Sequence, residues 1–101
     1  MTITRDDLEC AAKAAGIEGE YDEESQIVWY KNPFGDAAGF NPCRSREDAF
    51  DLAMKCGMYI DFFGGFVGAS TGEERRFTPH NHAECCEAIV LAAAEIWRNR
   101  K

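Results

Sequence analysis

The segment from His80 to Cys86 holds the densest group of side chains that could bind a metal. His82 precedes Cys86 by four residues, which places both on one side of a helix, and zinc accepts imidazole and thiolate ligands. A structural zinc ion takes four ligands, so Cys43 or Cys56 would have to complete the set. Because the chain has no Cys-x-x-Cys pair, we interpret the two histidines as the start of a helix and Cys86 as a core residue.

A catalytic Cys–His pair is the second chemical hypothesis for this segment. A thiol at Cys85 or Cys86, close to the start of a helix, would have its thiolate stabilised by the helix dipole. The sequence contains no nucleophile elbow, no phosphate-binding loop and no dinucleotide fingerprint. We therefore predict no enzyme activity, no cofactor and no metal.

Carboxylates are concentrated near the N-terminal end of the chain. The whole chain has 18 acidic and 11 basic residues, for a net charge of -7, which disfavours direct binding to nucleic acid. Catalytic carboxylates need a cleft that shifts their pKa values, whereas a turn between two strands is exposed to water. A dense acidic patch can instead bind a basic protein surface, although it also fits a solvated hairpin that keeps the protein soluble. The patch comprises Glu18, Glu20, Asp22, Glu23 and Glu24.

Aromatic residues make up 12% of the chain, which is more than one thin core face needs. Core packing accounts for most of those in predicted strands, but exposed aromatics beside carboxylates commonly anchor protein interfaces. We predict that the partner-binding surface is formed by Glu20, Tyr21, Asp22, Glu23, Glu24, Trp29 and Phe34.

Capping and turn residues predict the elements that position these side chains. Thr4 and Ser45 each precede a turn rich in acids, and they predict helices from Arg5 to Ala15 and from Arg46 to a stop at Gly57. A third, longer helix is predicted from Asn81 to Arg98. Hairpins are predicted for residues 18–22 with 26–30, and for 58–63 with 66–69 around a primed turn at Gly64-Gly65. Residues 31–43 read as a surface loop with at most a short extended piece, and residues 73–77 as a weak strand.

This element order predicts a single α+β domain over residues 1–101. We expect one antiparallel sheet of four or five strands with three helices packed on one face, in the order αββαββ(β)α. The longest apolar run, Ala88 to Ala94, is far shorter than the roughly 20 residues needed to cross a bilayer. The first residues lack the apolar core of a signal peptide. The sequence therefore predicts a cytoplasmic protein with no membrane partner, whose five cysteines are free thiols.

A resemblance adds to this prediction. The segment Phe40–Phe50, with its Asn41-Pro42 and Asp48-Ala49 pairs, resembles the NinX-type family of small phage proteins. The helix over Ala88–Glu95 is similar to the closing helix of many small phage proteins of this kind. The resemblance implies a phage or prophage origin and action inside a bacterial host cell, and it brings no catalytic residues with it.

Small acidic phage proteins without enzymatic motifs resemble inhibitors of host machinery, anti-CRISPR proteins among them. This class analogy implies a protein that binds and inhibits a host protein complex with a basic surface, in particular a nucleic-acid-binding defence (CRISPR) effector. Two alternatives remain open. One is a sponge that binds a nucleotide second messenger between the protomers of a homodimer, through Arg44, Arg46, Arg75 and Arg76. The other is a metal- or thiol-dependent module that uses His82 with Cys85 or Cys86.

Overall fold

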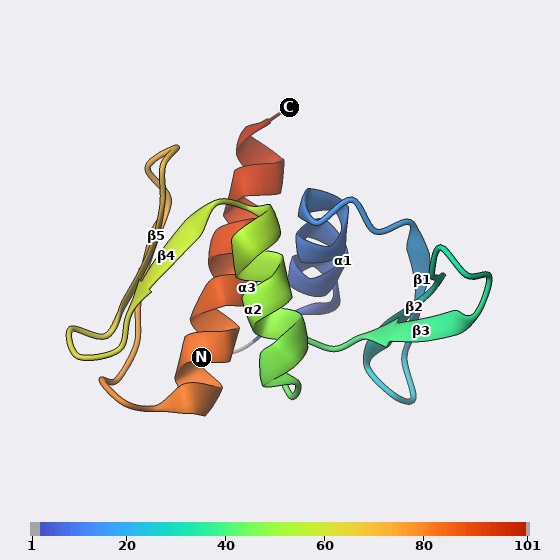
Figure 1. Ribbon diagram of the computed structural model, residues 1–101, viewed down its shortest axis with the longest axis horizontal. Helices are drawn as coiled ribbons and strands as arrows, with labels where there is room; N and C mark the ends of the chain where they lie inside the picture. The colour runs from blue at the N-terminus through green and yellow to red at the C-terminus, as the bar shows by residue number, and fades with distance from the viewer. Residues whose placement is uncertain (1–2, 101) are drawn as a thin grey trace.

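Three helices form the middle layer of the fold, and a three-stranded antiparallel sheet lies on each side of them (Figure 1). The structure is a computed structural model that describes residues 3–100. The helices are α1 (Arg5–Ala14), α2 (Arg46–Lys55) and α3 (His82–Asn99). The first sheet contains β1 (Gly19–Asp22), β2 (Ile27–Lys31) and β3 (Ala37–Phe40). The second sheet contains β4 (Met58–Asp61), β5 (Phe66–Ala69) and β6 (Glu74–Arg76). The predicted α+β class is confirmed.

The helices begin where the capping residues predict. The Thr4 hydroxyl accepts a hydrogen bond from the Asp7 backbone N–H, and the Asp7 carboxylate accepts one from the Thr4 N–H, which completes a capping box. The Ser45 hydroxyl caps α2 by accepting a hydrogen bond from the Asp48 N–H. Asn81 caps α3. The first turns are thus fixed by local side chains, which is why the sequence alone locates them.

The expectation of one sheet with all helices on one face is wrong. The chain forms two separate sheets, ordered β1-β2-β3 and β4-β5-β6, with α2 between them in sequence. The physical reason lies in α3, which is apolar around most of its circumference. It packs against α1, α2, β5 and β6, so a cover on one side alone would leave apolar surface in water. Its buried residues are Cys85, Cys86, Ala88, Ile89, Val90, Ala92, Ala93, Ala94 and Ile96.

The loop predicted over residues 31–43, with at most a short extended piece, contains one such piece: β3, which pairs with β2 along its whole length. The turn before β3 is held by the Asn32 side chain, whose oxygen accepts hydrogen bonds from the N–H groups of Phe34 and Asp36. The hairpin predicted over residues 58–69 is confirmed by β4 and β5. Its primed turn at Gly64-Gly65 is wrong, because β4 ends at Asp61 and a four-residue loop follows, in which only Gly65 has positive φ (+67°).

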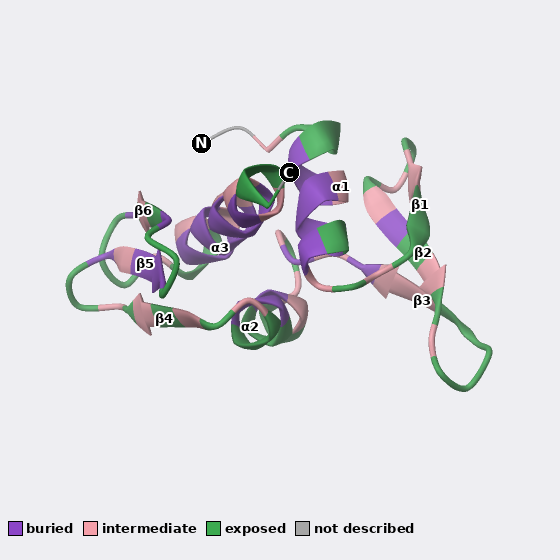
Figure 2. Cartoon of the chain, turned by 90° about the horizontal axis from the view of Figure 1, so that it is seen from above, coloured by how far each residue is buried: buried purple, intermediate pink, exposed green. Residues whose placement is uncertain are grey.

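The core lies mainly among the helices and the second sheet (Figure 2). From the first sheet, only Val28 and Phe40 are fully buried. The second sheet contributes Val67 and Ala69 to the buried set, and Phe77 follows just after β6. The first sheet therefore packs against the helices through few side chains, and its other face is open to solvent.

Candidate partner-binding surface

Strand register divides the predicted site between the two faces of the first sheet. Glu20 lies opposite Trp29, which in turn lies opposite Gly39. Tyr21, Val28 and Phe40 form the neighbouring row, and successive side chains of a strand point to opposite faces. Because Val28 and Phe40 are buried, their row faces the helices. We call the opposite side the outer face, and it carries Glu20, Asp22, Ile27, Trp29, Lys31, Ala37 and Gly39.

Trp29 is exposed and yet held in one place. The side chain and backbone together retain 44% of their accessible surface. The indole lies over Gly39, where a Cβ atom would come within 3.3 Å of Trp29 Cζ3. The indole Nε1–H donates a hydrogen bond to Ser25 Oγ over 3.3 Å. A large aromatic ring fixed in this way loses little conformational entropy when a partner covers it.

Asp22 shapes the turn beside Trp29. The Ser25 hydroxyl donates to Asp22 Oδ2 over 2.6 Å, and the Ser25 backbone N–H donates to the same oxygen over 3.3 Å. The hydrogen bond from the Ser25 hydroxyl is the main reason that the pKa of Asp22 lies below its usual range. This carboxylate is therefore ionised. It positions the Ser25 hydroxyl, which accepts the hydrogen bond from the Trp29 indole.

The other acids of the patch remain accessible. Glu20, Glu23 and Glu24 are all exposed. Arg5 of α1 reaches Glu23 over 3.3 Å and stacks over the Tyr21 ring with its guanidinium 5.1 Å from the ring centre. Within residues 3–100, neither Glu20 nor Glu24 forms an ion pair. These two carboxylates are consequently free to meet a cation from outside.

The structure brings together only part of the predicted set. Glu20, Asp22 and Trp29 share the outer face, and Glu23 and Glu24 lie in the adjoining turn. Tyr21 belongs to the inner face, half-buried beneath Arg5. Phe34 is 89% exposed, but it lies in the β2–β3 turn, at the opposite end of β2 from the acidic turn. A partner that covers Trp29 and the acids would not need to reach Phe34.

The histidines of the cysteine-rich segment contact aromatic rings. The His80 ring lies 5.1 Å from that of Phe63, and the His82 ring lies 5.1 Å from that of Phe62, measured between centroids. Burial raises the pKa of the Cys85 thiol to about 11, so this thiol is protonated at neutral pH. In the part of the chain that the structure describes, no three His, Cys, Asp or Glu side chains converge as a metal site would require. The zinc and thiol hypotheses therefore gain no support from the geometry.

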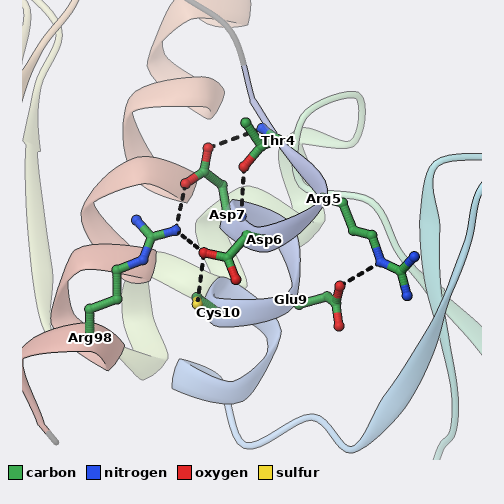
Figure 3. A network of polar contacts seen from close by, with 7 residues as sticks. All are labelled: Thr4, Arg5, Asp6, Asp7, Glu9, Cys10 and Arg98. Carbon is green, nitrogen blue, oxygen red and sulfur yellow. Dashed lines mark hydrogen bonds and ion pairs between the residues drawn. The ribbon is translucent and has the colours of Figure 1, made fainter.

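Sequence reasoning missed two features. The first is a set of exposed apolar side chains around the second sheet and α2, namely Phe50, Met54, Tyr59 and Phe63; the four-residue spacing of Phe50 and Met54 is the only signal that could have shown part of it. The second is an ion-pair network in which Arg98, near the end of α3, binds Asp6 and Asp7 at the start of α1 (Figure 3). No local pattern predicts that contact.

Comparison with known proteins yields no relative: no family model matches the chain, and searches of curated proteins and of solved structures found no match. Among residues 3–100, no helix is both long enough and apolar enough to cross a membrane.

Proposed function

We propose that this chain is a protein-binding module whose outer face and acidic turn dock onto a basic surface of a partner. The observation that carries the proposal is Trp29, a tryptophan pinned by Gly39 and Ser25 and still exposed, beside two carboxylates that have no cationic partner within residues 3–100. Binding hot spots are enriched in tryptophan. Carboxylates around such an anchor raise the association rate with a cationic surface and select against acidic ones.

The partner class that fits this chemistry is a protein complex that binds nucleic acid. Such a complex has a cationic channel for phosphate groups, and a rigid acidic surface can occupy it in place of the nucleic acid. The net charge of -7 and the resemblance to small phage proteins both favour a host defence effector of the CRISPR type. The protein would then act as an inhibitor inside a bacterial cell, by competing for the channel.

The test uses three versions of the tagged protein as baits in lysate that contains such complexes. The first is the wild type, and the second carries Glu20→Lys and Glu24→Lys. The third carries Glu47→Lys and Glu74→Lys, which changes the net charge equally at exposed acids on α2 and β6, away from the outer face. Captured proteins are eluted by a salt step, identified by mass spectrometry, and assayed for binding to labelled nucleic acid with and without the bait.

The proposal predicts one stoichiometric partner on the wild-type and Glu47/Glu74 baits, released by salt and absent from the Glu20/Glu24 bait. It also predicts that the wild-type protein displaces nucleic acid from that partner. Equal capture by all three baits would contradict the acidic interface. Capture without displacement would leave the interface standing and exclude the inhibitory role.

A further inference from the structure

The four arginines that the sequence singled out for a nucleotide site do not meet. Arg75 pairs with Glu95 of α3 over 3.4 Å. The Arg76 guanidinium stacks 5.5 Å from the centre of the Phe66 ring. Arg44 and Arg46 lie in a different part of the molecule, around the start of α2, and have no ion-pair partner in the described part of the chain. Both of these arginines line the same pocket.

Arg44 and Arg46 line an open groove of about 390 Å³ between the starts of two helices. One wall comes from the segment that leads into α2 and the other from the first turns of α3. Figure 1 shows that α2 and α3 run side by side with their first turns at the same end of the helical layer. The residues that line the groove are Cys43, Arg44, Arg46, His82, Ala83 and Cys86.

Two helix N-termini at one groove contribute partial positive charge there. The first N–H groups of a helix have no acceptor within the helix, and the helix dipole adds partial positive charge at this end. Ser45 and Asn81 each satisfy one such group, on the third residue of their helices. The backbone N–H groups of the first two residues of each helix are left for an acceptor from outside the helix. Arg44, Arg46 and the His82 imidazole add hydrogen-bond donors to the same space.

We propose that this groove binds the phosphoryl group of a small phosphorylated molecule, with Arg44 and Arg46 as the principal contacts. Guanidinium groups bind phosphate through paired hydrogen bonds, and a helix start offers backbone donors to the same anion. This site lies apart from the outer face of the first sheet, so it does not depend on the proposed partner binding.

The two cysteines that line the groove, Cys43 and Cys86, carry no charge at neutral pH. Burial raises the pKa of the Cys43 thiol to about 11 and also raises the pKa of the Cys86 thiol. Neither thiolate therefore forms at neutral pH to repel an anion.

Nearby acids weaken the site. Glu87, on the next part of α3, lines an adjoining hollow together with Arg44. Glu47 and Asp48 lie in the first turn of α2, where the Asp48 carboxylate accepts the Asn41 N–H over 2.9 Å. Because the groove is open and these carboxylates are close, we expect millimolar affinity for inorganic phosphate. Replacing Glu87 by glutamine should strengthen binding, since it removes a like charge.

The test is a titration followed by two-dimensional amide NMR, with inorganic phosphate and adenosine monophosphate as probes and sodium chloride at matched ionic strength as reference. Four proteins are compared. They are the wild type, Arg44→Gln with Arg46→Gln, Arg76→Gln with Arg100→Gln, and Glu87→Gln. The Arg76/Arg100 variant loses the same charge outside the groove. Unchanged amide dispersion in the absence of phosphate shows that each variant is folded.

The proposal predicts saturable shifts at His82, Ala83 and Arg46 with both probes. It predicts that the dissociation constant is larger by about tenfold or more in the Arg44/Arg46 variant, because hydrogen bonds to charged groups are lost. The Arg76/Arg100 variant should bind like the wild type, and Glu87→Gln should bind more tightly. Shifts that do not saturate, that chloride reproduces, or that weaken equally in both arginine variants would overturn the proposal. Saturation with phosphate alone would keep the anion site and exclude the nucleotide.

Discussion

Arg98 Nη2 lies 2.9 Å from Asp7 Oδ1, a contact across 91 positions of sequence that ties the last turn of α3 to the first turn of α1 (Figure 3). Asp7 is 7% exposed, and its other carboxylate oxygen accepts the Thr4 backbone N–H over 3.0 Å. One carboxylate therefore caps a helix and joins two helices. Arg98 also reaches the exposed Asp6 over 2.5 Å.

Replacing Asp7 by alanine should lower the free energy of unfolding by about 2–3 kcal/mol, because the capping hydrogen bond and a partly buried charge-assisted hydrogen bond are lost together. The midpoint of thermal unfolding should fall by about 10–20 °C. Asp6→Ala is the matched control and should cost less than about 1 kcal/mol, since it breaks an exposed ion pair and a long contact from the Cys10 thiol. Thermal unfolding followed by circular dichroism measures both. Equal losses would show that the burial of Asp7 adds nothing.

Acid should remove the contribution of Asp7. Burial acts to raise the pKa of this carboxyl, but the hydrogen bonds from Thr4 and Arg98 outweigh burial and bring the pKa below its usual value. The unfolded chain binds a proton near about pH 3.9, so the stabilisation is complete above that pH and is lost as the pH falls through the lower native pKa. The free energy of unfolding, measured with urea between about pH 5 and pH 2, should fall more steeply with decreasing pH for the wild type than for Asp7→Asn. Parallel curves would contradict this.

Gly65 should not tolerate a side chain. Its φ is +67°, and a Cβ atom there would overlap the carbonyl oxygen of Phe77. The Gly65 carbonyl also accepts the Phe77 N–H over 2.9 Å, which fixes the loop against the strand end. Gly65→Ala should cost about 3 kcal/mol or more, from overlap and backbone strain together. Gly72→Ala is the control, because φ is also positive (+103°) but the space is open, and it should cost only about 1 kcal/mol. Urea unfolding of both variants separates overlap from strain, and similar losses would refute the overlap.

Trp29→Ala should weaken partner binding by about 2 kcal/mol or more, as expected of a central aromatic anchor. Its effect on folding should be smaller than that of a core tryptophan, because the ring is partly exposed. Phe63→Ala removes an 83% exposed ring from the loop beside the second sheet and should leave affinity unchanged. Calorimetry with the captured partner makes the comparison. If both variants bind alike, Trp29 is not the anchor.

Local signals in the sequence predict the helices, both hairpins and the short strand β6, whereas long-range packing decides how the strands divide into sheets. Thr4 and Ser45 locate two helix starts because a cap acts within one turn. The strand β3 is predicted only as a short extended piece of a loop, because Ala37, Ala38 and Gly39 have low β propensity and only pairing with β2 makes them a strand. The division into two sheets follows from the near-continuous apolar surface of α3, which a count of strands does not show.

For the candidate site, too, the sequence predicts what depends on the first hairpin and does not predict contacts between distant segments. The alternation of a hairpin is enough to place Glu20 and Trp29 on a common face, because their register needs only a short turn. The half-buried position of Tyr21 depends on Arg5 from another element. The separation of Phe34 depends on β3, and the pinning of Trp29 depends on Gly39 of that same strand. These relationships arise only when distant segments pack.

Binding of the outer face to a cationic surface is tested best by the salt dependence of partner affinity. The dissociation constant of the captured complex is measured over a series of salt concentrations for three proteins: the wild type, Glu20→Lys with Glu24→Lys, and Glu47→Lys with Glu74→Lys. Affinity should fall steeply with salt for the wild type and the Glu47/Glu74 variant, because salt screens an interface that pairs opposite charges. The Glu20/Glu24 variant should bind weakly with a flattened dependence. The same slope for all three proteins would contradict the claim.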